Sequence, residues 1–322
     1  MRFDRMKVFS GSSHPKLATA ICAELGEPLG RISSVRFSNE NILLQVDENV
    51  RGCDVYVVQT ACSPLHDNIM ELLILIDALK HASAARITAV LPYMPYVRSD
   101  KKDRPRISIT ARLMADLLES AGANRVLVID LHAPQIQGFF RIPADHLLAA
   151  PLISDYLLRK DLHDAVLVAP DAGEVKDLIR YVDQLGLPMA IIDKRRVADD
   201  ECAKAVNIIG DVKDKTCILI DDEIASAGTM VSSASYLHQQ GAKRVLAACT
   251  HAVFSGNATE RLANAPFEEV IVTDTIPLPD QKRFPSLTVL SIAPILARAI
   301  SCIHYGDSVS RLFTGALQPV VR

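Results

Sequence analysis

Short apolar runs rich in β-branched residues alternate along this chain with helical patterns of about ten to twenty residues. Parallel neighbours in a sheet need such crossover segments, so the alternation predicts an α/β fold with a mainly parallel sheet flanked by helices. Several runs are apolar throughout, which is typical of strands covered on both faces. The predicted strands span residues 7–9, 55–59, 86–91, 125–129, 165–169, 189–192, 216–220, 245–249 and 270–273.

Helical periodicity is clearest after the second of these runs, over residues 65–80. It predicts a surface helix, with an apolar stripe (Leu65, Ile69, Leu72, Leu73, Ile76, Leu79) and a largely opposite polar side (Asp67, Asn68, Glu71, Lys80). Helices are also predicted over 110–120 and 229–240, each ending before a glycine. Residues 32–36 and 42–46 flank a turn-like segment and predict a projecting hairpin.

A chain of 322 residues is long enough for about two domains. The order of predicted elements up to about residue 143 is similar to the order from 151 to about 279, which indicates two α/β units of similar plan. We predict an N-terminal domain over 1–146 and a C-terminal domain over 147–292, with the boundary inside 144–151. The final segment, 293–322, is expected to pack back on the first domain.

Composition excludes several classes of protein. Lys+Arg (35) nearly balances Asp+Glu (38) and apolar residues make up 49%, so neither a disordered chain nor a polyanion-binding protein fits. The apolar stretches are much shorter than the roughly 18 residues of a membrane span, and the first residues lack a secretory or transit pattern. We expect a soluble, cytoplasmic protein with no nucleic-acid or membrane partner. The seven cysteines are scattered without a Cys-x-x-Cys pair, so reduced thiols are expected rather than a disulfide framework or zinc site.

The segment 216–229 carries the strongest chemical signal. A strand ends at Asp221 and Asp222, small and hydroxylated residues follow, and a helix begins near Thr229. Free N–H groups at a helix start bind phosphate, and two carboxylates accept hydrogen bonds from a vicinal diol. The order predicts a sugar-phosphate site; for the acid pair alone, an exposed acidic turn before an ordinary helix cap is the plainer interpretation.

This strand, loop and helix order resembles the ribose-phosphate loop of the type I phosphoribosyltransferase fold. Residues 126–140, which include Asp130-Leu-His132 and Gln135-Ile-Gln-Gly-Phe-Phe140, are similar to the signature of the ribose-phosphate pyrophosphokinase family, also called phosphoribosyl pyrophosphate synthetases. Further matches lie at 93–106, 170–173, 191–196, 207–211 and 308–313, so the resemblance runs from Ser10 almost to the C-terminus. It implies two phosphoribosyltransferase-like domains.

The resemblance implies transfer of the β,γ-diphosphoryl group of ATP to the anomeric hydroxyl of ribose 5-phosphate, giving phosphoribosyl pyrophosphate and AMP, with Mg²⁺. Such transfer needs positioning and charge neutralisation more than covalent catalysis. The implied catalytic residues are Lys194 and Arg196, in a polar run that otherwise reads as a solvated face. The implied ribose 5-phosphate residues are Arg196, Asp221, Asp222, Ala225, Ser226, Ala227, Gly228 and Thr229.

For the nucleotide, the resemblance implies Phe37, Asn39, Asn41, Arg98, Ser99 and His132. His132 and Asp171 are the implied metal ligands, although a lone histidine is more often a buried, hydrogen-bonded residue. The cations of segment 96–106 could alternatively suggest nucleic acid, which the near-zero net charge disfavours. Relatives share the nucleotide site between subunits, implying a homo-oligomer built from dimers, commonly a hexamer. Arg51, Ser308 and Ser310 match a regulatory anion site, with His81 replacing a nearby arginine.

Several residues depart from the family pattern and leave alternatives open. Asn39, Glu40 and Asn41 alter the carboxylates of the hairpin, and Ser99 replaces a glutamine. In the second domain, Ala225 and Ser226 replace an Asp-Thr pair, and Glu174 replaces a glycine in the loop that faces pyrophosphate. An active enzyme is the favoured hypothesis; a different nucleotide donor, or a non-catalytic paralogue that assembles with an active synthetase, remains open. A base-salvaging phosphoribosyltransferase is disfavoured by Asp130-Leu-His132 and Lys194-Arg-Arg196.

Overall fold

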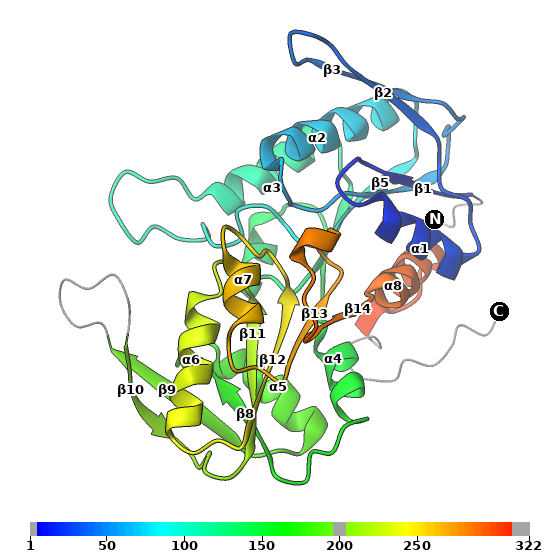
Figure 1. Ribbon diagram of the computed structural model, residues 1–322. Coiled ribbons are helices and arrows are strands. Elements are labelled where there is room, and N and C mark those ends of the chain that lie inside the picture. Colours follow the sequence, from blue (N-terminus) through cyan, green and yellow to red (C-terminus); the bar gives the residue numbers. More distant parts are fainter. Residues whose placement is uncertain (1–4, 196–203, 311–322) are drawn as a thin grey trace. The chain divides into compact units, whose positions relative to one another are not determined.

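The computed structural model describes residues 5–195 and 204–310, and the chain divides into two compact units (Figure 1). Unit 1 contains the chain up to Leu148, Thr275–Pro277 and the segment that starts at Ile292. Unit 2 contains Ala149–Asp274 and Leu278–Ser291. The predicted α/β class is confirmed, and the predicted boundary region holds strand β7 (Ala144–Leu147) and the start of helix α4 (Ala150–Leu157).

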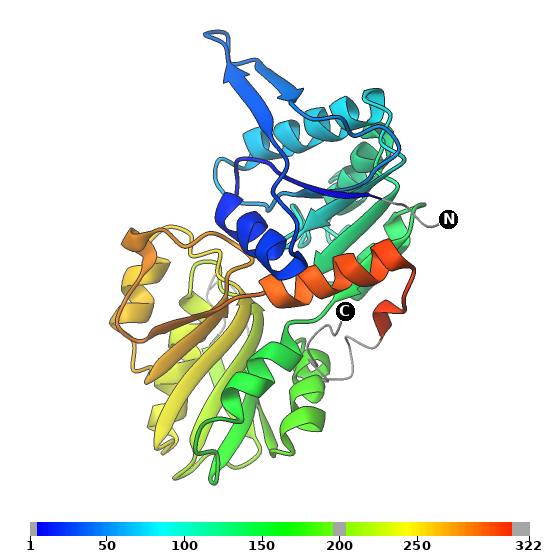
Figure 2. The same ribbon diagram turned by 90° about the vertical axis from the view of Figure 1, so that its right-hand side faces the viewer.

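Unit 1 is built on a five-stranded parallel sheet with the order β1-β4-β5-β6-β7. Alternate residues of its central strands face the two helical layers: Val55 and Val57 pack with α2 and α3, whereas the Tyr56 hydroxyl reaches α8. Helices α1 and α8 lie side by side although they come from opposite ends of the chain (Figure 2). The bounds are β1 Met6–Ser10, α1 Pro15–Leu25, β4 Asp54–Val58, α2 Leu65–His81, β5 Arg86–Leu91, α3 Thr110–Ala121, β6 Arg125–Ile129, the 3₁₀ helix η1 Pro134–Phe139 and α8 Ala293–Tyr305.

Helix α2 has the predicted extent but not the predicted faces. Asn68 and Glu71 were expected on its polar, solvent-facing side, and this expectation was wrong because both are buried, at 4% and 5% exposure. The Asn68 amide donates to the Cys62 carbonyl, and the Glu71 carboxylate accepts hydrogen bonds from Ser12 and from Gln59. Polar partners on neighbouring segments therefore hold these side chains inside the unit.

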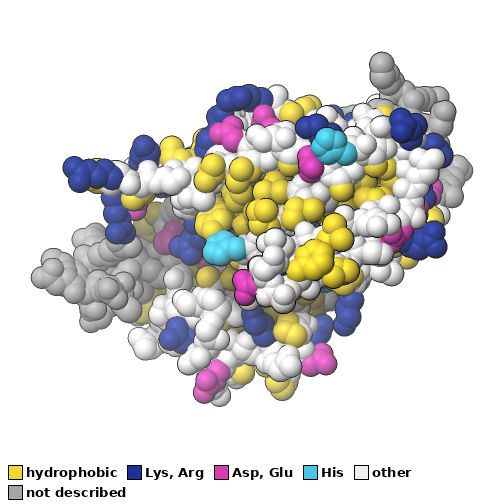
Figure 3. All heavy atoms as spheres, turned by 90° about the horizontal axis from the view of Figure 1, so that it is seen from above, with side chains coloured by type: hydrophobic (Ala, Val, Ile, Leu, Met, Phe, Trp, Pro, Cys, Tyr) yellow, Lys and Arg dark blue, Asp and Glu magenta, His cyan; other side chains and the backbone are white. Residues whose placement is uncertain are grey.

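The predicted hairpin is confirmed as β2 (Ile32–Arg36) paired antiparallel with β3 (Ile42–Val46). It projects beside α2, and its cross-strand neighbours Val35 and Leu43 are 51% and 55% exposed. Figure 3 views the face that carries the hairpin and α2 and shows hydrophobic side chains gathered among scattered charges. This hairpin contributes little to the core of unit 1, because Leu44, at 8% exposure, is the one buried residue of its two strands.

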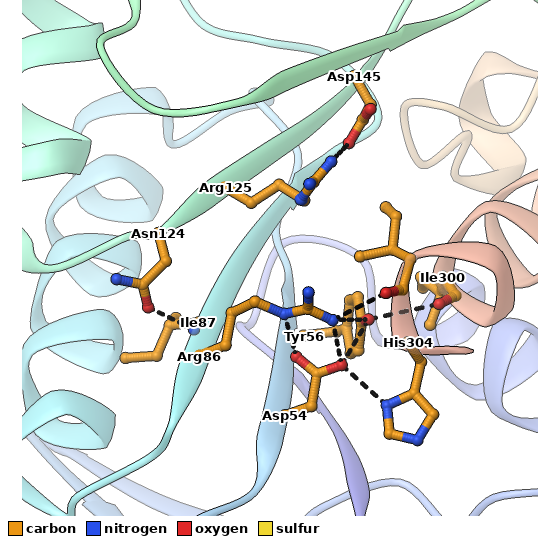
Figure 4. A network of polar contacts seen from close by, with 10 residues as sticks. Asp54, Tyr56, Arg86, Ile87, Asn124, Arg125, Asp145, Ile300 and His304 are labelled. Atoms are coloured by element: carbon orange, nitrogen blue, oxygen red, sulfur yellow. Dashed lines mark hydrogen bonds and ion pairs between the residues drawn. The ribbon is translucent and has the colours of Figure 1, made fainter. Parts of the chain in front are cut away.

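A buried ionic cluster fastens α8 to the sheet (Figure 4). Asp54 at the start of β4 accepts two hydrogen bonds from Arg86, at 2.7 and 2.6 Å, and lies 2.8 Å from His304 Nδ1. Tyr56 donates to the same carboxylate at 2.8 Å, and Arg86 also donates to the Ile303 carbonyl. Asp54 is fully buried, and a buried charge is costly unless it is paired. Arg86 and the other donors of the cluster provide that pairing.

Unit 2 contains a seven-stranded sheet with the order β10-β9-β8-β11-β12-β13-β14, parallel except for β10. The chain runs from β8 outward to β9 and then returns to β11 on the other side of β8, so the strand order reverses between β8 and β11. Ligands of open α/β sheets bind at the carboxyl ends of the strands beside such a reversal. The bounds are β8 Ala165–Ala169, α5 Val175–Leu185, β9 Met189–Arg195, β10 Lys204–Ile209, β11 Thr216–Glu223, α6 Gly228–Gln239, β12 Arg244–His251, α7 Ala258–Ala263, β13 Glu269–Thr273, the 3₁₀ helix η2 Asp280–Lys282 and β14 Leu287–Leu290.

Among the described residues, no helix is both long and apolar enough to cross a membrane. The described cysteines are free thiols, and four of them are buried (Cys22, Cys53, Cys217, Cys249). Burial raises the pKa of Cys22 to about 11 and that of Cys217 to about 12. These thiols are therefore protonated at neutral pH and pack as small apolar side chains.

Candidate functional site

Three carboxylates meet at the reversal point of the unit 2 sheet. Asp221 and Asp222 lie near the carboxyl end of β11, and Glu174 precedes α5 in the loop after β8. Each offers an oxygen within 4.8 Å of the others. The Asp222 backbone N–H donates to Asp221 Oδ1 at 2.9 Å, which fixes the orientation of the Asp221 carboxylate.

Burial raises the pKa of Asp221 well above its ordinary value, and the neighbouring charges of Asp222 and Glu174 raise it further. Cys249 is the register partner of Asp221 on β12, and burial together with the charges of Asp221 and Asp222 raises the pKa of its thiol. Three negative charges are unfavourable at this place, so the cluster is stabilised by binding a proton, a cation or a hydrogen-bond donor.

The loop that ends at Ala227 connects this acid pair to α6, and Gly228 and Thr229 are the first residues of that helix. Ala227 adopts a left-handed conformation, with φ 63°, immediately before the helix begins at Gly228. Two carbonyls of the loop are hydrogen-bonded. Ala225 O accepts from Ser255 N at 2.9 Å, and Ser226 O accepts from the Arg261 guanidinium at 3.2 Å. The first N–H groups of a helix have no partner within it, so this loop suits an anion.

The backbone at Gly228 is not crowded. An added Cβ at Gly228 would come no closer than 3.7 Å to Ser226 Oγ and 3.9 Å to an Arg261 nitrogen. Arg261, from the short helix α7, thus places a cation beside the loop. Sequence reasoning missed this residue, because nothing in the pattern around α7 indicates that it folds toward residues 226–228.

Asp171, the predicted metal ligand, follows β8 in the same loop as Glu174. Its Oδ1 accepts from the Gly173 N–H at 2.8 Å, so the loop turns around this carboxylate. Among the predicted ribose 5-phosphate residues, Asp221, Asp222, Ala225, Ser226, Ala227, Gly228 and Thr229 follow one another from the end of β11 to the first turn of α6. In the sequence, Glu174 stood out only because it replaces a glycine of the family pattern. Its position three residues after Asp171 could have indicated that the two carboxylates share a loop.

One of the two predicted catalytic residues lies in the described part of the chain. The backbone of Lys194 is within β9, opposite Ala205, and Arg196 lies outside the described residues. The ribose 5-phosphate role predicted for Arg196 therefore also falls outside the described chain.

The predicted nucleotide residues belong to unit 1. Phe37 lies at the hairpin tip and is 50% exposed, and Asn39 Oδ1 accepts from the Asn41 N–H within the turn. Arg98 is exposed, whereas the Ser99 hydroxyl meets Thr110 at the start of α3, accepting from Thr110 N at 3.4 Å. Ser99 is thus partly engaged in helix capping.

His132 is half-buried in the loop after β6, and the preceding residue Leu131 donates its backbone N–H to the His146 side chain at Nε2. The predicted anion-site residues are exposed: Arg51 donates to the Ser83 hydroxyl at 3.2 Å, and Ser308 Oγ accepts from Ser310 N at 3.3 Å.

Known proteins resemble this chain over nearly its whole length. The family model for the N-terminal domain of ribose phosphate pyrophosphokinase matches residues 6–122, and the model for the phosphoribosyl synthetase-associated domain matches 200–314. The chain is 50% identical over 308 residues to the ribose-phosphate pyrophosphokinase of Oceanobacillus iheyensis, covering 96% of this chain and 97% of that one.

The ribose-phosphate pyrophosphokinase of Bacillus subtilis is 48% identical over 309 residues, with the same coverage of 96% and 97%. Among solved structures, the phosphoribosylpyrophosphate synthetase of Mycobacterium smegmatis matches with a TM-score of 0.90 and 45% identity, covering 94% of this chain and all of that one.

Proposed function

The chain belongs to the ribose-phosphate pyrophosphokinase family, and we propose that it transfers the β,γ-diphosphoryl group of ATP to the anomeric hydroxyl of ribose 5-phosphate. The products are phosphoribosyl pyrophosphate and AMP. The observation that carries this proposal is the acid pair Asp221–Asp222 next to the loop before α6, in a chain half identical to named synthetases.

The sugar phosphate binds along the loop in this proposal. The 5-phosphate accepts hydrogen bonds from the amides of residues 226–229, where the helix dipole favours negative charge. The ribose diol donates to the carboxylates of Asp221 and Asp222, which lie directly before this loop. Holding both ends of the sugar directs its anomeric hydroxyl, and such orientation is a large part of the rate gain in transfer reactions.

Mg²⁺ suits the groups present. Magnesium prefers oxygen ligands, and Glu174, Asp221 and Asp222 place carboxylate oxygens within 4.8 Å of one another. The fixed carboxylate of Asp171 follows the neighbouring strand and is proposed as a further ligand. His132, in unit 1, keeps its proposed role as a metal-binding residue. When bound, magnesium would neutralise charge on the transferring phosphates.

Donor binding is assigned to unit 1. The exposed ring of Phe37 is available to stack on a base, and Asn39, Asn41, Ser99 and His132 complete the proposed nucleotide set. Arg98 would bind phosphate oxygens, and Lys194 and Arg196 would neutralise the transferring group. We also propose a homo-oligomer built from dimers, and a regulatory anion site at Arg51, Ser308 and Ser310.

A second candidate is a non-catalytic paralogue that modulates an active synthetase. The observation that favours it is Glu174, since its carboxylate adds negative charge beside the acid pair where pyrophosphate would have to approach. A different nucleotide donor is favoured by the amides of Asn39 and Asn41 in the hairpin turn.

One assay separates these candidates. The purified chain is incubated with ribose 5-phosphate, Mg²⁺ and ATP, and AMP and phosphoribosyl pyrophosphate are quantified; ADP and other nucleoside triphosphates are parallel donors. We expect AMP from ATP, with a loss of about a hundredfold or more in Lys194→Ala. Turnover with another donor alone would replace ATP, and no turnover with any donor would favour the paralogue.

A further inference from the structure

Glu71, on helix α2, is a buried carboxylate that accepts three hydrogen bonds on one oxygen. Ser12 donates its backbone N–H at 2.8 Å and its hydroxyl at 2.7 Å, and the Gln59 side-chain amide donates at 2.8 Å. Ser12 belongs to the loop between β1 and α1, so this carboxylate fills a place at the carboxyl edge of the unit 1 sheet. Loops at that edge are where α/β units bind ligands. Here the Glu71 side chain accepts the hydrogen bonds that the loop could otherwise donate to a ligand.

The carboxylate fixes the orientation of Gln59, which follows β4 and is 2% exposed. Gln59 Nε2 donates to Glu71 and to the Asn68 carbonyl, so Oε1 faces Ser13 and accepts from its backbone N–H at 3.1 Å. The amide lies against Gly11, where an added Cβ would come within 2.4 Å of Oε1. The position and orientation of this amide are therefore both determined.

From Gln59 the contacts continue to the loop after β5. Ser13 Oγ accepts from the Thr60 N–H at 2.8 Å, and Thr60 Oγ1 accepts from the Tyr93 N–H at 3.2 Å. Ala61 N in turn donates to the Tyr93 carbonyl at 2.9 Å. Tyr93 begins the segment that carries Arg98, so both backbone groups of its first residue are held by Thr60 and Ala61.

We propose that Glu71 is a positioning residue for donor binding: through Gln59 and Thr60 it holds the start of the loop that places Arg98 and Ser99. The inference rests on the nucleotide role proposed for that loop. Glu71 itself contacts no substrate in this account. Its carboxylate, rather than solvent or a ligand, accepts the hydrogen bonds of the β1–α1 loop. The loop after β5 is then ordered before the nucleotide arrives, which lowers the entropic cost of binding.

The test uses Glu71→Gln in the full chain, which preserves shape but replaces an acceptor-only carboxylate by a neutral amide. The matched control is Glu269→Gln in unit 2, which also removes a carboxylate with three donors, from Tyr156, Lys160 and Thr288. Steady-state kinetics give KM for ATP, KM for ribose 5-phosphate and kcat. We expect Glu71→Gln to raise KM for ATP about tenfold, with the other two values within about twofold.

The control should leave KM for ATP unchanged even where it lowers the unfolding temperature. An equal rise in both KM values, a fall in kcat alone, or an unchanged KM for ATP in Glu71→Gln would overturn the proposal.

Amide hydrogen exchange tests the same inference without activity. In Glu71→Gln the Tyr93 amide should exchange at least about tenfold faster, while the Asn124 amide, which donates to Ile87 O elsewhere in the same sheet, should keep its rate. Equal acceleration of both amides would mean general destabilisation and would sink the proposal. If the wild-type chain turns over no nucleotide, the proposed function fails, and the exchange data still decide whether Glu71 holds this loop.

Discussion

At the scale of single residues, Glu174 is the side chain that most alters the chemistry of the acid cluster. A glycine there would leave Asp221 and Asp222 as a pair, whereas Glu174 adds a third carboxylate oxygen within 4.8 Å. Its charge is one reason why the pKa of Asp221 is raised. Glu174 can therefore repel an approaching pyrophosphate or help to hold a cation. Added Mg²⁺ should weaken the repulsion, whereas the second effect needs the cation to be present.

The raised pKa of Asp221 predicts how stability depends on pH in metal-free buffer. The folded state binds this proton more tightly than the unfolded chain, so the stability it contributes is present at low pH and lost as pH rises through the raised pKa. Glu174→Gln removes one cause of the shift and should stabilise the protein at pH 7 by on the order of 1 kcal/mol, because one pKa unit corresponds to about 1.4 kcal/mol.

Urea unfolding of wild type and Glu174→Gln over a pH series measures this difference. The gain should shrink as the pH falls and Asp221 becomes protonated in both proteins, and it should also become smaller when Mg²⁺ is added. A gain of the same size at every pH would contradict an electrostatic origin.

Arg261 supports a second prediction at this scale. Its guanidinium donates to the Ser226 carbonyl and lies beside Gly228, so it adds positive charge where the 5-phosphate is proposed to bind. Arg261→Met preserves much of the side chain's length and should raise KM for ribose 5-phosphate about tenfold, with KM for ATP unchanged. Arg244→Met is the control, since Arg244 is the first residue of β12 and lies at the end of the sheet away from the proposed site. Similar kinetics in both variants would exclude a phosphate role for Arg261.

At the scale of helices and strands, the sequence predicts elements well where burial follows local pattern. The runs that became β5, β6 and β8 have their predicted bounds, because each is mostly apolar and lies in a sheet interior. Strand β7 was missed because its four residues include Asp145, which pairs with Arg125 on β6. Strands β10 and β14 were missed as well, and both are at sheet edges, where one row of partners suffices.

Periodicity also misplaced Asn68 and Glu71, since a helical wheel sorts side chains by polarity and contains no information about partners. Glu71 is buried because Ser12 and Gln59 lie opposite it, and these residues are 59 and 12 positions away. The acid pair of the candidate site was predictable, because Asp221 and Asp222 are adjacent in sequence. Arg261 was not, because its contact to Ser226 spans 35 residues.

The loop between β1 and α1 gives a prediction about element packing. Gly11→Ala would force its Cβ to within 2.4 Å of the buried Gln59 amide, which is hydrogen-bonded on both sides and cannot retreat freely. We expect a loss of about 1–3 kcal/mol in the free energy of unfolding. Gly138→Ala, in η1, meets no atom within 4 Å and should cost at most about 0.5 kcal/mol. Chemical denaturation measures both, and equal costs would show that Gly11 is not constrained by Gln59.

At the scale of the whole molecule, unit 1 is not a continuous stretch of sequence. Its last helix, α8, arrives after the whole of unit 2 and packs beside α1, and the cluster around Asp54 joins residues 250 positions apart. Burial raises the pKa of Tyr56, so its hydroxyl remains a neutral donor to Asp54. The folded state of unit 1 therefore depends on the C-terminal segment as well as on the N-terminal half of the chain.

Asp54→Ala tests how strongly this cluster closes unit 1. The Arg86–Asp54 pair and the Arg36–Asp67 pair both have N···O distances of 2.6 Å, but Asp54 is fully buried whereas the side chains of Arg36 and Asp67 are 49% and 43% exposed. Removing one partner of a buried pair leaves a charge without compensation, so Asp54→Ala should lower the free energy of unfolding by about 3–5 kcal/mol. Asp67→Ala should cost about 1 kcal/mol or less, because water screens the exposed pair.

Equilibrium unfolding gives both costs, and hydrogen exchange locates them. In Asp54→Ala the amides in the last turn of α8 should lose protection together with those of β4, because Asp54, His304 and the Ile303 carbonyl share one network. Amides of β11 and β12 in unit 2 should retain their protection, since none of the groups in this network belongs to that unit. Equal costs for the two variants, or unchanged protection in α8, would mean that apolar packing against α1 alone holds the final helix in place.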